Sequence, residues 1–258
     1  MTLRYDSRMT SREQFDRQAA HYDHQWADWN RQSLRWMIEA ARAQPHHRLL
    51  DVATGAGFTA FGFAPHVRQV VGLDVSPGML AQARAKGIAN ALFEEGSAEA
   101  IPFPDESFDL VTCRIAPHHF DSVPAFLREA HRVLVRGGRL LVADTTVPDN
   151  APELAAWQHR VEALRDPSHV RNYTLSQWRA FVDDAGFRLE QINQLDALPD
   201  MTLEDWLVKA GCQGDAAGQV QQLFRDASAA AREAFAIQER EGDYAFAWQR
   251  VALSSVKP

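Results

Sequence analysis

The chain has 258 residues, 46% of them hydrophobic, and a formal net charge of −7 at pH 7. This length suits one large α/β domain with helical additions, and the acidic balance without a basic run argues against nucleic acid or an anionic membrane surface as a partner. The first eight residues lack the apolar core of a signal peptide, and no stretch approaches the ~18 apolar residues of a membrane span. We therefore expect a cytoplasmic protein without membrane insertion. The two cysteines, Cys113 and Cys212, support neither a disulfide framework nor a thiolate metal site.

Residues 1–44 are predicted to form an N-terminal helical segment of one or two helices. Trp26, Trp29 and Trp36 recur at helical spacing, and Pro45 ends the pattern. Because no basic surface accompanies these tryptophans, we interpret them as packing residues rather than as platforms on which bases stack.

Residues 45–148 contain five mostly apolar runs, each separated from the next by a helical pattern or a turn. Such runs indicate a parallel sheet that helices cover on both faces. One intervening helix is predicted to start with Ser76 as its N-cap and Pro77 in its first position, and another to cover Val123–Val135 and stop at Gly137-Gly138. The five runs are Arg48–Val52, Val67–Asp74, Ala91–Glu95, Phe108–Cys113 and Gly138–Ala143.

Residues 149–258 combine further helices with two late strands. The strands, joined by a long excursion, are expected to form a hairpin-like pair at one edge of the sheet. The helices of the excursion suit either the roof of a pocket or the contact face of a homodimer. The predicted helices cover 151–164, 175–185 and 202–241, and the predicted strands cover 187–195 and 244–257.

The turn after the first strand is typical of a nucleotide-binding half-site. Gly55 and Gly57 allow a sharp turn and close approach of a ligand, and Asp74 ends the second strand where a carboxylate can accept hydrogen bonds from ribose hydroxyls. The segment Gly55–Ala60 also satisfies the G-x-G-x-x-G/A pattern of dinucleotide-binding proteins. Asp51 favours a cationic cofactor instead, because a negative charge near the turn would weaken phosphate binding.

Five segments, in this order, resemble the class I S-adenosylmethionine-dependent methyltransferases, specifically the group similar to ubiquinone and menaquinone C-methyltransferases. The resemblance implies an α/β fold: a Rossmann-like, doubly wound, seven-stranded sheet of order 3-2-1-4-5-7-6, with strand 7 antiparallel and added helices forming a cap. One domain, 1–258, would then comprise the N-terminal helical segment 1–44, a cofactor-binding core 45–148, and lid helices with the final two strands in 149–258. The segments are Asp51–Gly57, Gly72–Leu80, Gly96–Phe103, Ser107–Val111 and Arg132–Gly138.

The resemblance also implies S-adenosyl-L-methionine as the cofactor and places its parts along the chain. The glycine turn would surround the methionine end, Asp74 the ribose, and the residues after it the adenine. Ser97 stands where the family commonly has Asp, and Ala53 replaces a glycine found in many class I enzymes but matches the quinone-methylating group. The predicted cofactor-binding residues are Tyr22, Asp51, Ala53, Gly55, Gly57, Asp74, Val75, Met79, Ser97, Ala98 and Arg114.

The segment Arg114–Phe120 follows the fourth strand, at the edge where doubly wound sheets bind ligands. Its adjacent histidines, His118 and His119, are the candidate catalytic residues, because an acceptor that still carries a proton needs a base with a pKa near neutrality. The alternative is that one histidine caps the next helix or hydrogen-bonds to the backbone while the other faces solvent. No metal is predicted, because adjacent histidines point apart. The segment Arg165–Arg171 is either part of a lid or a polar turn made by Asp166-Pro167.

The expected function is methyl transfer from S-adenosylmethionine to a small-molecule acceptor, through a carbon, oxygen or nitrogen nucleophile. The expected mechanism is an in-line displacement without a metal, in which positioning and exclusion of water supply most of the rate. Two alternatives stay open at this point: a nicotinamide-dependent oxidoreductase and a non-catalytic S-adenosylmethionine-binding protein. Spacing carries no code for the identity of the acceptor.

Overall fold

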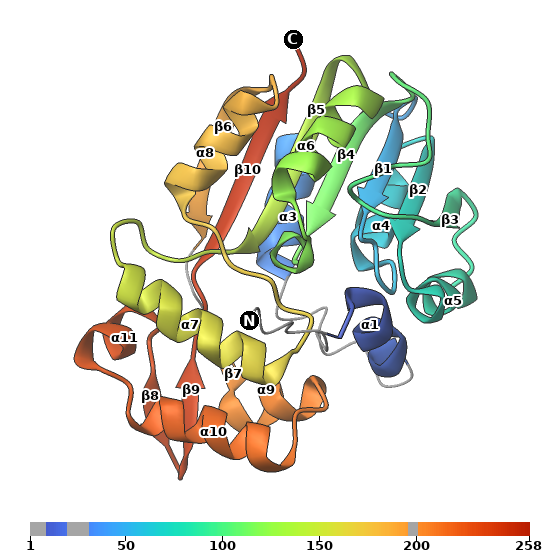
Figure 1. The fold of residues 1–258 in the computed structure, drawn as a ribbon. Helices are drawn as coiled ribbons and strands as arrows, with labels where there is room; N and C mark the ends of the chain where they lie inside the picture. Colours follow the sequence, from blue (N-terminus) through green and yellow to red (C-terminus); the bar gives the residue numbers. More distant parts are fainter. Residues whose placement is uncertain (1–8, 20–30, 196–200) are drawn as a thin grey trace, which may run out of the picture.

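A seven-stranded sheet forms the centre of the molecule (Figure 1). The structure is a computed structural model, and it describes residues 9–19, 31–195 and 201–258. The strand order is β3-β2-β1-β4-β5-β10-β6, in which β10 is antiparallel to both of its neighbours and is the seventh strand of this sheet along the chain. The predicted fold and order are therefore confirmed. The strands are β1 Arg48–Val52, β2 Gln69–Asp74, β3 Ala91–Glu95, β4 Phe108–Arg114, β5 Leu134–Thr145, β6 Arg188–Leu195 and β10 Arg250–Val256.

Helices cover both faces of this sheet, because successive strand residues point to opposite sides. In β1, for example, Leu50 and Val52 belong to one buried cluster and Leu49 to the other. The first cluster also takes in α6 and α8, and the second takes in α3, α4 and α5. The helices are α3 Arg31–Ala41, α4 Phe58–Phe63, α5 Pro77–Ala85, α6 Val123–Val133 and α8 Leu175–Asp184.

Local signals set several of these boundaries. The Ser76 hydroxyl accepts a hydrogen bond from the backbone N–H of Met79 at 3.1 Å, and Pro77 opens α5, as predicted. The end of α6 differs from the prediction. The helix stops at Val133 and β5 begins at the next residue, so Gly137-Gly138 lie inside the strand rather than at the helix terminus.

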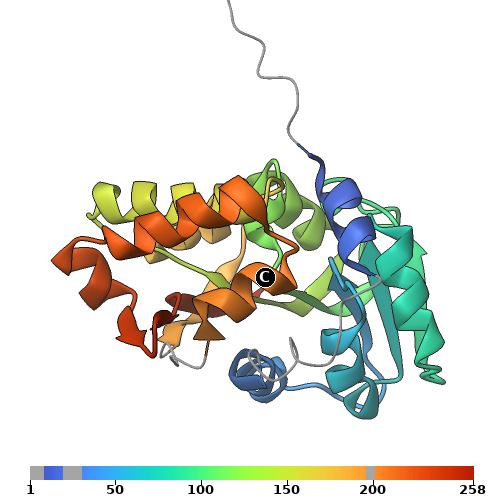
Figure 2. The same ribbon diagram turned by 90° about the horizontal axis from the view of Figure 1, so that it is seen from below.

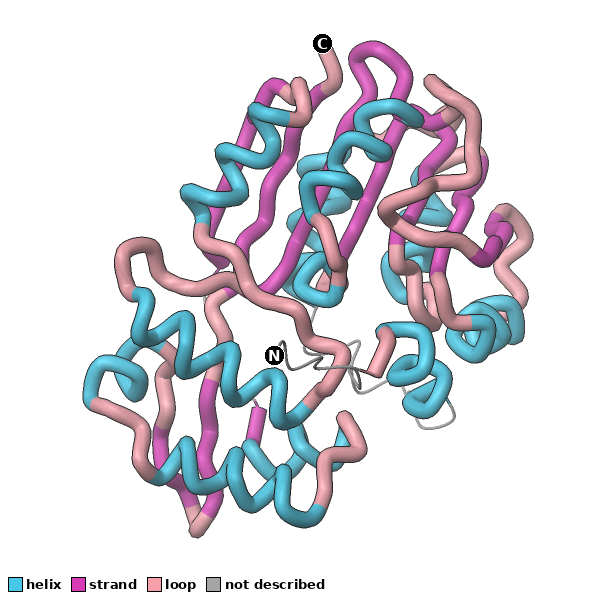
Figure 3. The backbone as a smooth tube through the Cα atoms, in the orientation of Figure 1, coloured by secondary structure: helices cyan, strands magenta, loops and turns pink. Residues whose placement is uncertain are grey.

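A cap lies beside the carboxyl ends of the parallel strands (Figures 1 and 3). It has its own aromatic core, in which Phe224, Phe235 and Phe246 are fully buried and Trp157 stacks on Phe235 with ring centroids 5.4 Å apart. Two parts of the sequence-based prediction were wrong here. Residues 238–240 form a strand rather than part of a helix, and the predicted single strand 244–257 is divided between two sheets. The cap contains α7 Pro152–Arg165, α9 Leu203–Lys209, α10 Gly214–Arg225, α11 Ala229–Ala234, β7 Met201–Thr202, β8 Gln238–Arg240 and β9 Asp243–Phe246.

The N-terminal helix α1 (Ser11–Ala19) lies on the opposite side of the same sheet edge, where it contacts α5. Figure 2, seen from below, shows the cap and α1 on either side of the strand ends. The Asp16 carboxylate accepts a hydrogen bond from the backbone N–H of Gly78 at 3.0 Å. Among the helices that the structure describes, none is long and apolar enough to cross a membrane.

Candidate functional site

The turn between β1 and α4 requires left-handed backbone at three positions. Ala53, Gly55 and Gly57 have φ values of 54°, 52° and 85°. A Cβ on Gly57 would lie 2.8 Å from the ring of Phe61, whereas a Cβ on Gly55 would project into open space. The left-handed φ at Ala53 gives a physical reason why many class I enzymes have glycine there. The space beside Gly55 is therefore the part of the turn that a ligand can approach.

Two carboxylates, those of Asp51 and Asp74, accept hydrogen bonds from residues of this turn. Asp51 accepts hydrogen bonds from the hydroxyls of Thr54 at 2.7 Å and Thr112 at 2.8 Å, and burial raises the pKa of its carboxyl group to about 6. Asp74 accepts from the backbone N–H of Gly55 at 2.7 Å and of Ser76 at 2.9 Å. Burial also raises the pKa of Asp74. Both side chains are nearly inaccessible, but Asp74 borders a cavity and Asp51 does not.

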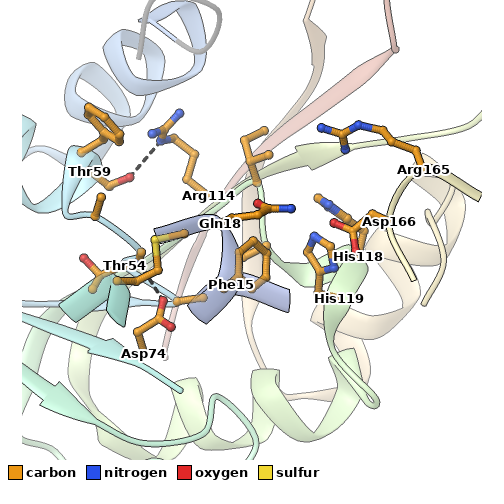
Figure 4. Close-up of a pocket in the computed structure, with 17 residues that line it drawn as sticks. Phe15, Gln18, Thr54, Thr59, Asp74, Arg114, His118, His119, Arg165 and Asp166 are labelled. Carbon is orange, nitrogen blue, oxygen red and sulfur yellow. Dashed lines mark hydrogen bonds between the residues drawn. The ribbon is translucent and has the colours of Figure 1, made fainter. Parts of the chain in front are cut away.

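Two cavities adjoin at this sheet edge and share Phe15, Ala53, Asp74, Ala116 and His119. The first, of about 120 Å³, lies between the glycine turn and the cap (Figure 4). The second, of about 360 Å³, continues past Asp74. Further residues of the first are Gln18, Gly55, Met79, Arg114, His118, Arg165 and Asp166, and further residues of the second are Val75, Gly96, Ser97, Ala98, Glu99 and Phe120.

The predicted site residues are therefore mostly brought together. The cavities are lined by Ala53, Gly55, Asp74, Val75, Met79, Ser97, Ala98, Arg114, His118 and His119. Asp51 and Gly57 do not border either cavity, and Tyr22 falls outside the described residues. The Nε of Arg114 donates to the Thr59 hydroxyl at 2.8 Å, which holds its side chain beside the turn.

Asp144 contacts both the ring and the backbone of His118. It is the penultimate residue of β5, and no role is predicted for it from the sequence. One carboxylate oxygen of Asp144 lies 2.6 Å from the ring Nδ1 of His118, and the other accepts from its backbone N–H at 2.9 Å. Burial lowers the pKa of His118, but the charge of Asp144, the hydrogen bond to it and the charges of Glu162 and Asp166 together raise this pKa by more. The predicted alternative in which one histidine is a helix cap finds no support in these contacts.

His119 has a different environment, although it is the next residue. Its Nδ1 lies 3.1 Å from the hydroxyl of Ser168, which in turn donates to the carboxylate of Asp166 at 2.6 Å. Burial and the neighbouring His118 lower the pKa of His119 to about 3. His119 is therefore a neutral ring with a polar partner, and it makes an edge-to-face contact with Phe15, with ring centroids 5.0 Å apart.

Sequence reasoning missed the contribution of the cap and of α1 to the cavity walls. Arg165 and Asp166 border the first cavity, and Asp166 makes the predicted polar turn by accepting from the backbone N–H of Ser168 at 2.9 Å; a lid role for the segment 165–171 stays a prediction. Phe15 and Gln18 enter from α1. Within the described part of the chain, no group of three or more His, Cys, Asp or Glu side chains is arranged to hold a metal ion.

A doubly wound sheet with an antiparallel seventh strand, a glycine turn and an acidic end of β2 defines the class I methyltransferase architecture. Comparison with known proteins agrees. The methyltransferase domain family matches residues 50–142. The uncharacterized methyltransferase YcgJ of Bacillus subtilis is 36% identical over 233 residues, which are 89% of this chain and 91% of that protein. The chain belongs to the class I S-adenosylmethionine-dependent methyltransferases.

Two further comparisons bear on the fold and the group. The crystal structure of the YcgJ protein superposes with a TM-score of 0.81 at 34% identity, covering 88% of this chain and 98% of that one. A demethylmenaquinone methyltransferase of Deinococcus radiodurans is 44% identical over 117 residues, 42% of this chain and 48% of that protein. These matches confirm the predicted resemblance and set aside the oxidoreductase alternative.

Proposed function

We propose that this enzyme transfers a methyl group from S-adenosylmethionine to a small-molecule acceptor by in-line displacement without a metal. The observation that supports this most is the pair of adjoining cavities that share Asp74 and His119. Together the two cavities suit the cofactor, and the first also has polar side chains on the wall that the cap contributes. When bound, the cofactor supplies an electrophilic methyl group on a sulfonium.

The second cavity fits the nucleoside part of the cofactor. Val75 and Ala98 offer apolar faces for adenine, and the Ser97 hydroxyl offers a polar contact at its edge. Asp74 lies where both cavities meet, so its carboxylate suits the two ribose hydroxyls. The open space at Gly55 is the place where a side chain would otherwise exclude the ligand.

The methionine part would then lie in the first cavity, beside the glycine turn. Arg114 brings a positive charge to this wall, which suits the cofactor carboxylate. Asp51 contributes through the turn rather than by contact, because it lies behind Thr54. Gly57 has the same indirect role, and Tyr22 stays a prediction for the segment that closes over the cofactor.

The acceptor would lie near His118 and His119, between the turn and the cap. The size of the first cavity and its polar walls of His119, Arg165 and Asp166 support a small molecule. The names of the relatives include demethylmenaquinone methyltransferases, and these support a small ring compound as the kind of acceptor to test first. One of the two histidines contributes to methylation of the acceptor. Binding of the cofactor by the other site residues does not depend on this histidine.

Isothermal titration with S-adenosylmethionine tests this proposal, with NAD as competitor in a second titration. We expect binding that S-adenosylhomocysteine displaces and NAD does not. Incubation of a metabolite extract with methyl-labelled cofactor, in the presence of a metal chelator, then tests turnover. Absence of binding at millimolar cofactor contradicts the proposal, and binding without any labelled product favours the non-catalytic alternative.

We also propose that residues 1–258 act as one domain, with 45–148 as the cofactor-binding core. Residues of α1, of the core and of the cap line the same pair of cavities. This arrangement supports one domain built from three parts rather than separate domains. The homodimer suggested for the helices of 202–241 is tested by light scattering during size-exclusion chromatography.

A further inference from the structure

We propose that Asp144 is a positioning residue that makes His118 the base of the reaction, with Nε2 of His118 as the atom that takes the proton. This inference rests on the proposed methyl transfer, and it selects between two histidines that the sequence leaves equivalent. Asp144 has no part in the sequence-based prediction. The argument depends on which ring nitrogen each histidine has available.

The geometry fixes the ring of His118. Asp144 is 1% exposed, and its two oxygens hold the backbone N–H and the ring Nδ1 of the same residue, at 2.9 and 2.6 Å. An ionised carboxylate can only accept hydrogen bonds, so the neutral ring carries its proton on Nδ1 and has a lone pair on Nε2. Among the described residues, no hydrogen-bond partner occupies Nε2, and His118 borders the first cavity.

His119 lacks this direct contact with a carboxylate. The Ser168 hydroxyl gives its proton to Asp166, so it accepts from Nδ1 of His119. A hydroxyl therefore stands between the ring and the negative charge. The ring of His118, with its centroid 4.2 Å away, opposes a second positive charge. His119 is thus suited to hydrogen-bond the acceptor in its neutral form, and His118 to receive a proton.

Several charged groups surround the two rings and must be considered together. Glu162 on α7 and Asp166 after it favour the protonated form of His118, in the same direction as Asp144. Arg165 opposes protonation of His119. The groups that face the histidines are Asp144 from β5, Glu162 and Arg165 from α7, and Asp166, Ser168 and His169 from the segment that follows.

The proposal defines the class of acceptor as a hydroxyl compound or an activated carbon acid. Its proton passes to Nε2 of His118, its electron pair forms the bond to the methyl carbon, and the carbon–sulfur electron pair stays on sulfur as the thioether. One positive charge disappears from the sulfonium and one appears on the imidazolium, where the Asp144 carboxylate stabilises it. A tertiary amine has no proton to lose and gains nothing from this pair.

Nuclear magnetic resonance of the protein labelled with ¹⁵N-histidine tests the pair directly. The chain has ten histidines, and loss of one signal in His118→Gln assigns the ring. We expect wild-type His118 to be the Nδ1–H tautomer above its titration midpoint. In Asp144→Asn the side-chain amide can donate to Nδ1, so the tautomer should become Nε2–H and the midpoint should fall by about one pH unit or more.

Ser168→Ala is the matched control, because it removes the partner of His119 and leaves Asp144 in place. It should shift the signals of His119 and leave the tautomer of His118 unchanged. An Nε2–H tautomer of His118 in the wild-type protein overturns the proposal, and so does a midpoint that Asp144→Asn leaves unchanged. The tautomer is read from the wild-type protein and needs only the assignment from His118→Gln, so it decides the proposal even if Asp144→Asn does not fold.

Titration of the same samples with S-adenosylhomocysteine separates this inference from the proposed function. We expect Asp144→Asn to bind it within about threefold of the wild type, because Asp144 does not border the cofactor cavities. Failure of the wild type to bind contradicts the proposed function, whereas the tautomer decides the role of Asp144. With a methylated acceptor in hand, Asp144→Asn should lower kcat by about 100-fold and change KM little.

Discussion

The Asp74 carboxylate accepts hydrogen bonds from the backbone N–H groups of Gly55 and Ser76. In the proposed complex it also accepts hydrogen bonds from the ribose. We predict that Asp74→Ala weakens the affinity for S-adenosylhomocysteine about tenfold or more, because charge-assisted hydrogen bonds are worth about 1.5–3 kcal/mol. The free energy of unfolding should also fall by about 1–3 kcal/mol, because the buried N–H groups of Gly55 and Ser76 lose their acceptor. Calorimetric titration and urea unfolding measure the two effects.

Asp74→Asn is the matched control for this substitution. It keeps one acceptor oxygen and the size of the side chain, so stability should recover more than affinity does. A dissociation constant that Asp74→Ala leaves unchanged would show that the carboxylate serves the turn alone.

Asp51 gives a pH-dependent prediction. Burial raises its pKa from the ordinary value of 3.8 to about 6, so the folded protein holds this proton more tightly than the unfolded chain does. The resulting stability is fully present below about pH 4 and is lost as the pH rises through about 6, by an amount on the order of 3 kcal/mol. Asp51→Asn has no such proton. The difference in unfolding free energy between wild type and Asp51→Asn, measured in urea at pH 4.5 and pH 7, should therefore shrink or reverse in favour of the variant at the higher pH.

The chain itself contains the signal for one residue that sequence reasoning missed. Asp74 is predicted to be a site residue because it ends an apolar strand at the ligand-binding edge of the sheet. Asp144 directly follows the apolar run Gly138–Ala143 and satisfies the same rule. Arg165 and Phe15 are different, because only the tertiary fold brings the cap and α1 to the strand ends.

The turn between β1 and α4 offers a test at the scale of an element, since its two glycines have different surroundings. Gly55 borders the cavity, and a Cβ there meets nothing within 4 Å, whereas a Cβ on Gly57 meets Phe61 at 2.8 Å and Ala83 at 3.2 Å. We predict that Gly55→Ala mainly weakens cofactor binding and that Gly57→Ala mainly lowers stability. Left-handed strain adds about 1–2 kcal/mol to the cost of either substitution.

The pair serves as its own control, because both glycines have positive φ and only one borders the cavity. Melting temperatures and dissociation constants for S-adenosylhomocysteine, measured side by side, distinguish the two effects. Equal losses of affinity in both variants would show that the turn moves as a rigid unit and that the space beside Gly55 has no special role.

At this scale the core elements could be predicted and parts of the cap could not. The five parallel strands follow from apolar runs because burial on both faces leaves a strong local pattern. The apolar pattern also runs on from Tyr244 through Trp248, so nothing local marks the break before β10. The break arises because Trp248 packs in the cap, with its ring centroid 5.0 Å from that of Phe235, while Gln249 accepts from the backbone N–H of Thr146 at 2.9 Å. Strand β8 likewise depends on pairing with β9.

The whole molecule has separate hydrophobic clusters in the sheet and in the cap, and this arrangement predicts separate local stabilities. Phe224 is fully buried in the cap cluster, 4.9 Å from Phe246 between ring centroids. We predict that Phe224→Ala destabilises the cap by about 3–5 kcal/mol. Amide hydrogen exchange should then accelerate in α9, α10 and α11, while β1, β4 and β5 keep their protection.

Val208→Ala on α9 is the control, because Val208 is 65% exposed and its loss should change exchange nowhere. The variant Phe224→Ala should still bind S-adenosylhomocysteine, since the second cavity is built from the sheet and α1. A uniform loss of protection in sheet and cap would show instead that the two clusters unfold as one cooperative unit.

Strand β10 lies between β5 and β6 in the sheet, although the ribosome makes it only after β6 and the whole of the cap. While the cap is being synthesised, β6 has no neighbour to pair with, because β5 is two positions away. An unpaired strand on a nascent chain is exposed to association with other chains. The sequence of β6 is polar, with Arg188, Glu190, Gln191 and Asn193 among its eight residues. Polar side chains disfavour association with other chains both before β10 is made and in the final position of β6 at the sheet edge. Arrival of β10 then closes the sheet and joins both ends of the cap to it in a single late step of folding.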